Sequence, residues 1–284
     1  MTNMKKYNSS ILCFPGNKRS CFYCCPPIRE PEYDPLAKKN DIHSQLVNNK
    51  VNINKNILFP SEIGHKCWGL GYLDSKKMLV GCLLHPSRNN EIDLRELTGY
   101  REKCGREVCL ESRQFLRLEK KDAQFLLNLS LDMDSFQYSS RVFNPTFAML
   151  SWGPSLLSAI AKKERYSIID HQLFKDKYSM FLSKLNYKAD SYLVERIVIL
   201  NGLENFLSLG ITAYQAFKDD IIYNIRLNYP YNYSDHNCSY IHKYPISPEC
   251  TRFFKFGLNI WRGEWKIIEE IINIINKTIS KLKK

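Results

Sequence analysis

The sequence lacks the features that would place the chain in a membrane or outside the cell. No apolar run approaches the roughly 18 to 20 residues that a membrane span requires. The N-terminus contains lysines but no apolar stretch behind them, so no secretory signal peptide is predicted. Ser10, Ile11 and Leu12 also differ from the small residues that precede a lipoprotein cysteine. We therefore expect a cytoplasmic protein.

Enzyme motifs are scarce as well. With only 12 glycines, the chain has no phosphate-binding glycine-rich loop, and a dinucleotide-binding fold is not predicted. There is no His-Glu-x-x-His pair and no Cys-x3-Cys-x2-Cys group of the kind used in radical chemistry. Acidic pairs such as Asp219-Asp220 are typical of solvated helix faces rather than of catalytic dyads. The sequence leaves the question of an enzymatic activity open.

The positive charge is not concentrated in one segment. The net charge is +12, of which +5 belongs to residues 1–112 and +7 to residues 113–284. A nucleic-acid-binding arm or stripe would gather the basic residues in one place. Nucleic-acid binding therefore stays an alternative that the charge does not favour.

What the sequence does have is cysteine. Eight of the ten cysteines lie in the first 112 residues. In a reducing compartment, thiols and metal thiolates are more common than disulfides, although buried free cysteine is a third alternative. Thiolates bind zinc and iron strongly because they are soft and charged. The candidate metal ligands are Cys13, Cys21, Cys24, Cys25, Cys67, Cys82, His85, Cys104 and Cys109.

This set is too large for one ion with four ligands. It fits two mononuclear sites, or one cluster with spare thiols. The strongest four candidates are Cys67, Cys82, Cys104 and Cys109, and His85 can replace any of them. Structural zinc is the favoured cofactor because such sites accept Cys and His together; an iron–sulfur cluster with a redox or enzymatic role is the alternative.

Two details of the set stay open. Cys24 and Cys25 are adjacent, so in an extended chain they point in different directions and serve separate ions, or one of them packs in the core. Near the C-terminus, His236, Cys238, His242 and Cys250 form either a second zinc site or a polar loop with incidental cysteines.

The cysteine pattern resembles a known family. Cys-Phe-Tyr-Cys-Cys at 21–25 is similar to the Cys-Gly-x-Cys-Cys signature of cysteine-cluster proteins described as zinc- or iron-chelating. Cys67-Trp-Gly-Leu, Cys82-Leu-Leu-His-Pro and Cys104 follow in the order that this family shows. The resemblance covers about residues 13–109. It implies metal chelation by these cysteines and no particular reaction.

Residues 1–112 read as an irregular cysteine-rich module. A proline-rich extended loop is predicted after Cys25, and residues 37–56 are predicted to form a polar connector, either mobile or weakly helical, in which His43 is solvated. The stretch LGYLDSKKMLVGCLLHP predicts a hairpin that turns at Asp74–Lys77, with Cys67 entering its first strand and Cys82 on its second. Asp93 is a plausible cap for a short helix.

Residues 113–284 predict an α-helical domain. Apolar residues recur at helical spacing, and Pro154 is suited to a first helical turn. We expect Asp170 and Asp190 to cap helices and Gly210 to end one. The last helix, from Trp261 to Leu282, packs in the core or contacts a partner or membrane surface.

The overall expectation is an α+β protein that is mostly α. Residues 1–112 form the metal-binding module with its short hairpin, and residues 113–284 form the helical domain. The predicted function is metal binding by a structural Cys/His zinc site, with a helical domain that contacts a protein partner.

Overall fold

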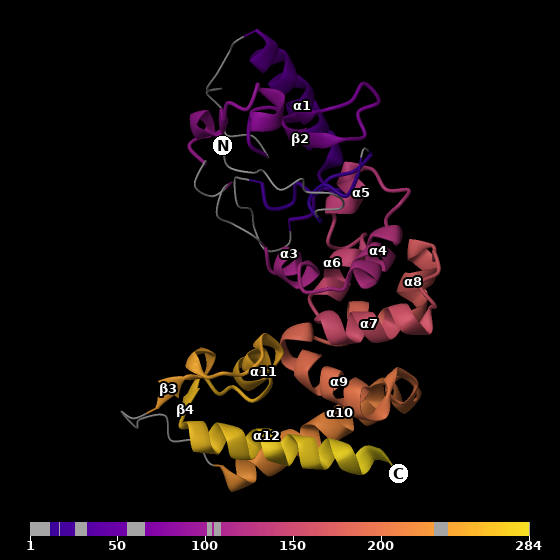
Figure 1. The fold of residues 1–284 in the computed structure, drawn as a ribbon, viewed down its shortest axis with the longest axis vertical. Helices are drawn as coiled ribbons and strands as arrows, with labels where there is room; N and C mark the ends of the chain where they lie inside the picture. Colours follow the sequence, from indigo (N-terminus) through magenta and orange to yellow (C-terminus); the bar gives the residue numbers. More distant parts are fainter. Residues whose placement is uncertain are drawn as a thin grey trace. The chain divides into compact units, whose positions relative to one another are not determined.

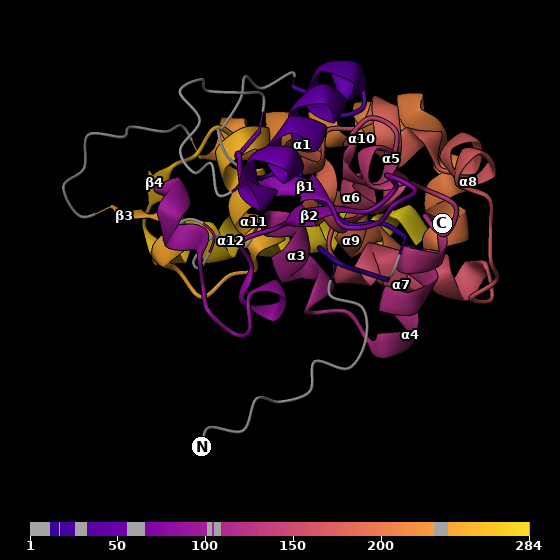
Figure 2. The same cartoon turned by 90° about the horizontal axis from the view of Figure 1, so that it is seen from above.

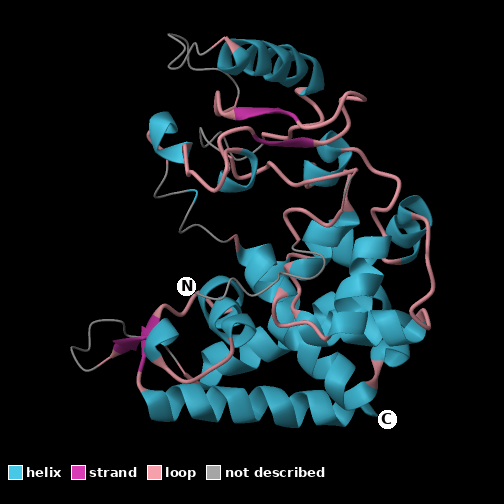
Figure 3. Cartoon of the chain, turned by 45° about the horizontal axis from the view of Figure 1, so that its top comes forward, coloured by secondary structure: helices cyan, strands magenta, loops and turns pink. Residues whose placement is uncertain are grey.

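The computed structural model describes residues 12–16, 18–25, 33–55, 66–100, 104, 109–229 and 238–283. Contacts divide the chain into two compact units. Figures 1 and 2 show the ribbon in two views, with the helices and strands labelled. Unit 1 comprises Met1–Phe147 and Ile168–His171, and unit 2 comprises Ala148–Ser167 and Gln172–Lys284. The described residues are mostly helical, with strands in two short pairs (Figure 3), as the sequence predicts.

The described part of unit 1 contains one helix of 16 residues, several short helices and one hairpin. Its elements are α1 (Lys39–Asn54), β1 (Leu70–Tyr72), β2 (Val80–Cys82), the 3-10 turns η1 (Pro86–Arg88) and η2 (Arg95–Thr98), α3 (Leu110–Phe115), α4 (Lys120–Asn128) and α5 (Ser135–Ser139). The next helix, α6 (Pro145–Leu150), contains the division between the units.

The predicted hairpin is confirmed. Strands β1 and β2 pair antiparallel, with Leu70 opposite Cys82 and Tyr72 opposite Val80. Asp74 stabilises the turn because its carboxylate accepts the backbone N–H groups of Met78 and Leu79, both at 3.0 Å. Cys82 is therefore fixed on a strand, as expected.

The segment predicted as a loose connector is instead the packed helix α1. Ile42 and Leu46 are fully buried in a cluster with Leu70, Tyr72 and Phe22. Asn49 donates to the carbonyl of Leu70 at 2.9 Å and also to that of Cys67. The sequence did not indicate that this segment packs in the core, because only a few apolar residues of the helix are buried. The hydrogen bonds of the buried Asn49 also hold the helix against the hairpin.

His43 is also not a freely solvated side chain. It is half-buried on α1, and its Nδ1 lies 2.7 Å from the hydroxyl of Tyr72.

The division between the units falls later in the chain than residue 112. The hydroxyl of Ser135 lies 3.0 Å from the backbone N–H groups of both Ser20 and Val80, which donate to it. Ser139 accepts the N–H of Phe22 at 2.9 Å. Helix α5 thus holds the cysteine-rich segments by buried hydrogen bonds, which is why the stretch after residue 112 belongs to unit 1.

Unit 2 is a set of helices with a second, smaller strand pair. Its elements are α7 (Pro154–Lys163), most of α8 (His171–Lys177), the π-helical turn η3 (Met180–Lys184), α9 (Tyr187–Asn201), α10 (Leu203–Asn228), β3 (Ser239–Tyr240), η4 (Ile241–Lys243), α11 (Pro248–Arg252), the π-helical turn η5 (Phe253–Gly257), β4 (Arg262–Gly263), α12 (Trp265–Ser280) and η6 (Lys281–Lys283). Helices α9, α10 and α12 pack against one another (Figure 1).

Several helical signals in unit 2 are confirmed. Pro154 begins α7, and Leu156, Leu157 and Ile160 form its buried face. Gly210 has φ 73° and interrupts α10, where a left-handed backbone favours glycine. The buried face of α12 consists of Ile268, Ile271, Ile275 and Ile279, while Trp261 lies outside the helix.

The expected cap at Asp190 is wrong. Asn186 caps α9 by accepting the N–H of Lys188 at 3.0 Å. Asp190 lies one turn inside the helix, almost fully buried, where it accepts hydrogen bonds from Lys218 at 2.9 Å and from the Tyr214 hydroxyl at 3.0 Å. Sequence alone does not show that a carboxylate has partners on the next helix.

None of the helices in the described ranges combines the length and the apolar character needed to cross a bilayer.

Candidate functional site

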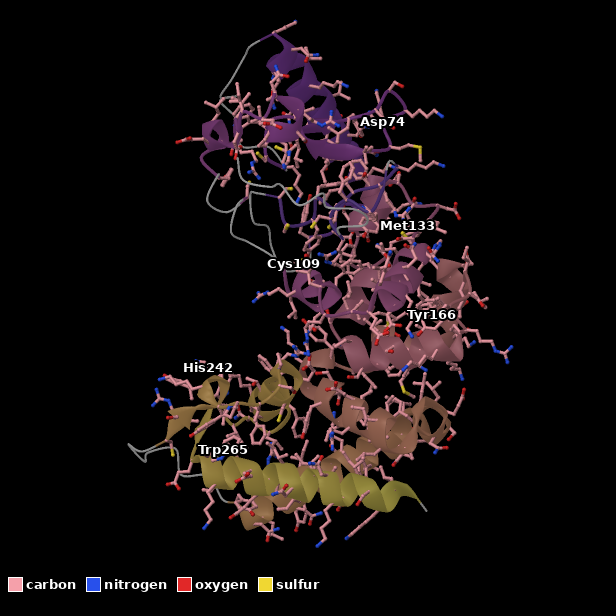
Figure 4. All side chains as sticks on the ribbon, viewed as in Figure 1. Asp74, Cys109, Met133, Tyr166, His242 and Trp265 are labelled. Carbon is pink, nitrogen blue, oxygen red and sulfur yellow. The ribbon has the colours of Figure 1, made fainter. Side chains whose placement is uncertain are left out.

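All ten cysteines lie within the described residues, and each is a free thiol. Eight of them belong to unit 1. Figure 4 labels Cys109 and shows further sulfur atoms in the same part of unit 1. The mutual effects of the thiols on their pKa values divide these cysteines into two groups.

The first group, called here the Arg141 group, contains Cys13, Cys21, Cys24 and Cys109. Burial, followed by the neighbouring thiols of Cys21, Cys24 and Cys109, raises the pKa of Cys13 from the ordinary 9.0 to about 12, although Arg141 lowers it. Burial and then Cys21 raise the pKa of Cys24 as well. Four thiols that come from distant points of the chain are therefore electrostatic neighbours.

Local backbone bonds position the N-terminal members of this group. The N–H of Cys21 donates to the carbonyl of Cys13 at 2.9 Å, and Gly16 pairs with Arg19 in an antiparallel bridge between them. A tight turn then follows, in which the N–H of Cys25 donates to the carbonyl of Phe22 at 3.1 Å. The eight-residue interval between Cys13 and Cys21 is thus a small loop that returns to its start.

Cys109 reaches the group from the beginning of α3. It is the N-cap residue of that helix, and its sulfur accepts the N–H of Ser112 at 3.4 Å. Burial and Glu111 nevertheless raise its pKa to about 12, while the Ser112 bond and Arg141 lower it.

A guanidinium lies among these four thiols. Arg141 Nη1 is 3.9 Å from the sulfur of Cys21, and its Nε is 3.5 Å from Glu111. The rings of Phe147 and Tyr23 lie 3.7 and 4.4 Å from the guanidinium carbon. Burial lowers the pKa of Arg141, but Cys21, Glu111 and Cys109 raise it above its usual value. The Arg141 guanidinium is therefore placed to stabilise negative charge on the thiols of this group.

The second group, called here the hairpin group, contains Cys67, Cys82 and Cys104. Burial raises the pKa of Cys67 to about 11, and Cys82 and Cys104 contribute to that rise. Burial also raises the pKa of Cys82, again with a contribution from Cys104. The β1–β2 pairing explains why Cys82 affects Cys67. Cys82 lies opposite Leu70, which follows Cys67 by three residues.

The sulfurs of the hairpin group accept hydrogen bonds from nearby backbone. The N–H of Gly69 donates to Cys67 at 3.4 Å, and the N–H of Leu84 donates to Cys82. Each donor lies two residues after its cysteine, so both turns present the same geometry. Hydrogen bonds to sulfur favour the thiolate form and are typical of bound metal thiolates.

A cation also accompanies the hairpin group. Arg95 lowers the pKa of Cys82, and it is held in place by Asp93, with Nη2 2.7 Å from the carboxylate. Asp93 accepts the backbone N–H of Arg95 as well, at 3.1 Å, which makes it the anchor of η2 rather than a simple cap.

Cys25 lies between the two groups. Burial raises its pKa well above 9.0, and Cys24 and Cys21 of the Arg141 group and Cys67 of the hairpin group all add to the rise. The nearby cation is Lys66, which is buried and donates to the carbonyls of Tyr23 at 2.9 Å and Cys25 at 3.2 Å.

His85 is less closely tied to the thiols. It is exposed, and its Nδ1 accepts the N–H of Ser87 at 3.2 Å as the cap of η1. Burial, followed by Arg95, lowers its pKa, and the other charges that act on it are Asp93 and Arg88. No cysteine contributes to that shift.

The four strongest candidates are thus divided between the groups. Cys67, Cys82 and Cys104 share one, whereas Cys109 belongs with Cys13, Cys21 and Cys24. In neither group, nor elsewhere in the described part of the chain, do three His, Cys, Asp or Glu side chains already form a shell that could hold a metal ion.

The C-terminal candidates show no comparable grouping. Cys250 is buried on α11, where burial raises its pKa to about 12 and the Tyr192 hydroxyl is its hydrogen-bond partner. His242 stacks on Tyr240, with ring centroids 5.5 Å apart. His236 lies outside the described residues.

Sequence reasoning missed the cations of the site. Arg141, Arg95 and Lys66 are single basic residues in ordinary surroundings, and only the fold brings them to the thiols. A signal for Arg95 was present in Asp93, two residues before it, but nothing in the sequence marked Arg141.

Comparisons with known proteins add no assignment. No family model matches the chain, and neither the curated proteins nor the solved structures contain a significant match to it.

Proposed function

We propose that unit 1 is a structural metal-binding module with two zinc ions. The first ion is bound by the Arg141 group, Cys13, Cys21, Cys24 and Cys109. The second is bound by the hairpin group, Cys67, Cys82 and Cys104, with Cys25 as the fourth ligand. The observation that carries the proposal is this division into neighbouring sets of thiols, each accompanied by a cation.

Charge balance supports the proposal. Zinc with four thiolates has a net charge of about −2, which is costly to bury without compensation. Arg141 supplies a positive charge to the first group, and Arg95 and Lys66 supply positive charges to the second. Without a metal, these cations would lie beside neutral thiols, because burial raises the thiol pKa values to about 11 and 12.

The choice of Cys25 over His85 also follows from the surroundings. Burial and then Cys24 raise the pKa of Cys25, and Cys67 of the hairpin group adds to that rise; the pKa of His85 is lowered by burial and then Arg95, with no thiol among its causes. The Nδ1 of His85 is already engaged by Ser87. Cys24 and Cys25 then serve separate ions, as their adjacency suggests.

The direct test is metal content together with the visible spectrum of protein purified without oxygen. The expected result is two zinc per chain and no absorption near 400 nm. Cys13→Ser and Cys67→Ser should each lower the zinc content by about one, while Cys250→Ser, a buried thiol of unit 2, should leave it unchanged. Iron with acid-labile sulfide would instead establish the iron–sulfur alternative.

A pair of variants tests which residue is the fourth ligand of the second zinc ion. Cys25→Ser should release the second ion, and His85→Ala should retain both. The reverse result would make His85 the ligand and Cys25 a core thiol.

The helical unit 2 is proposed to carry the interaction surface of the protein. In this account zinc has no catalytic part: it holds unit 1 together, because the irregular cysteine-rich segments contain little regular structure of their own.

A further inference from the structure

One end of unit 2 exposes an unusual number of aromatic side chains. Tyr240 is 40 %, Phe256 48 % and Trp261 44 % exposed, although large aromatic rings are normally buried. These residues lie on or beside the strand pair β3–β4, near the beginning of α12. Figure 4 labels His242 and Trp265 at this end. We call these exposed rings, with His242 and the cations around them, the β3–β4 surface.

The rings are arranged in two exposed sets. In the first, Tyr240 pairs across the strands with Arg262, whose guanidinium carbon is 4.0 Å from the ring centroid, and His242 stacks against the same ring. In the second, Phe256 and Trp261 meet edge to face, with centroids 5.8 Å apart. Arg262 follows Trp261 directly, so the two sets adjoin at β4.

Cations surround both sets. Lys188 and Lys255 lie 5.7 and 5.4 Å from the rings of Phe256 and Trp261, and Lys243 lies 5.9 Å from that of Tyr240. The acidic residues between positions 238 and 266 are Glu249 and Glu264. Glu249 is buried in an ion pair with Arg252. Glu264, beside β4, is exposed, but it stands against four cations, Lys188, Lys243, Lys255 and Arg262, so the surface is positively charged as well as aromatic.

This combination has a specific chemical complement. A single-stranded nucleic acid offers unpaired bases that stack on aromatic and guanidinium planes, and phosphates that pair with lysine and arginine. An apolar protein partner would not require the cations, and a bilayer would not require stacked planar groups. We propose that the β3–β4 surface binds single-stranded nucleic acid, with bases on Tyr240 and Trp261 and phosphates on Lys188, Lys243, Lys255 and Arg262.

This inference does not depend on the metal proposal. It uses residues of unit 2 alone, whereas the proposed ligands all lie in unit 1. The net charge, which is spread over the whole chain, gave no sign of it; the local arrangement of rings and cations does.

The test is fluorescence anisotropy of the full-length protein with a labelled 20-nucleotide single strand. We expect it to bind the single strand more tightly than a duplex of the same length. Affinity should fall with salt at a logarithmic slope of roughly 3, because about four phosphate contacts are made at about 0.7 each. Tyr240→Leu and Trp261→Leu, which keep apolar bulk but remove the ring, should each weaken binding about tenfold.

Matched controls separate the surface from general charge and from unfolding. Tyr223→Leu removes an exposed ring from α10, and Lys162→Glu reverses an exposed charge on α7; both should leave affinity unchanged, while Lys243→Glu should weaken it. Far-ultraviolet circular dichroism checks that each variant is folded.

Three results would overturn the proposal. The first is no binding of the single strand, and the second is equal binding of duplex and single strand without any effect of the ring variants. The third is binding only to vesicles of anionic lipid, which would make the surface a membrane contact instead.

Discussion

At the scale of single residues, Arg141 is the most informative side chain of unit 1. Its guanidinium contacts two aromatic rings, Glu111 and the sulfur of Cys21 at once. The guanidinium is half-buried, and these partners together offset the cost of withdrawing its charge from water. The site thus depends on a residue that no cysteine pattern reveals.

Replacing Arg141 should destabilise unit 1. Arg141→Gln removes a half-buried charge from Glu111 and the thiols, and we expect a loss of about 2 kcal/mol in the free energy of unfolding. Urea denaturation measures the loss. Arg113→Gln is the matched control, because Arg113 is an exposed arginine on α3. Equal stability of the two variants would contradict the role given to Arg141.

The raised thiol pKa values predict a pH dependence for the protein after metal removal. The pKa of Cys13 is about 12 and that of Cys67 about 11 in the folded chain, whereas both return to the ordinary 9.0 on unfolding. The unfolded state therefore loses protons first, so this part of the stability is intact below about pH 9 and is lost as the pH rises toward 12. Thermal unfolding between pH 8 and 11 measures it.

Metal reverses this trend near neutral pH. Zinc displaces the thiol protons, so zinc affinity should increase as the pH rises from about 6 to 8. Metal-loaded protein should then gain thermal stability over that range. A stability that is independent of pH with zinc present would contradict thiolate ligation.

At the scale of elements, helices with a regular apolar pattern could be predicted from the sequence, whereas the packing of a helix with few apolar residues could not. The faces of α7 and α12 follow directly from their leucine and isoleucine spacing. The packing of helix α1 in the core was not predicted, because its buried positions are few and one of them is Asn49. The hairpin was predictable because the polar turn at Asp74 is local.

Helix α1 should prove to be part of the folded core of unit 1. Leu46→Ala creates a cavity at a fully buried position, and we expect a loss of about 3 kcal/mol with faster hydrogen exchange along the helix. Val51→Ala changes an exposed position of the same helix and should have little effect. Similar exchange rates in the two variants would restore the picture of a loose connector.

The contact between α9 and α10 offers a second test at this scale. Asp190→Asn keeps the shape of the side chain but leaves the largely buried Lys218 without its counter-charge, and a loss of about 3 kcal/mol is expected. Asp219→Asn, on the exposed side of α10, is the control. Thermal melts followed at 222 nm compare the two.

At the scale of the whole molecule, the grouping of the thiols was the part that the sequence could not provide. The presence of a cysteine-rich half and a helical half was predictable from composition and periodicity. Which cysteines are neighbours depends on the fold, because Cys109 joins Cys13 across most of unit 1 and Cys25 lies near Cys67. The same holds for the division between the units, which is fixed by buried contacts of Ser135 and Ser139.

The two units should respond differently to a chelator, because the proposed metal sites belong to unit 1 alone. We expect metal removal to expose unit 1 to protease while most of the helical signal of unit 2 persists, since all proposed ligands lie in unit 1. Mass spectrometry of the fragments identifies the cleavage sites. Unchanged protease resistance of unit 1 would count against a structural role for the metal.

The central claim is that thiolates of unit 1 hold zinc. X-ray absorption at the zinc edge, on protein purified without oxygen, tests it most directly. The account predicts a shell of about four sulfur atoms at about 2.3 Å with no nitrogen contribution. Absence of zinc, or a shell made mainly of nitrogen and oxygen, would contradict it and leave the cysteines as free thiols.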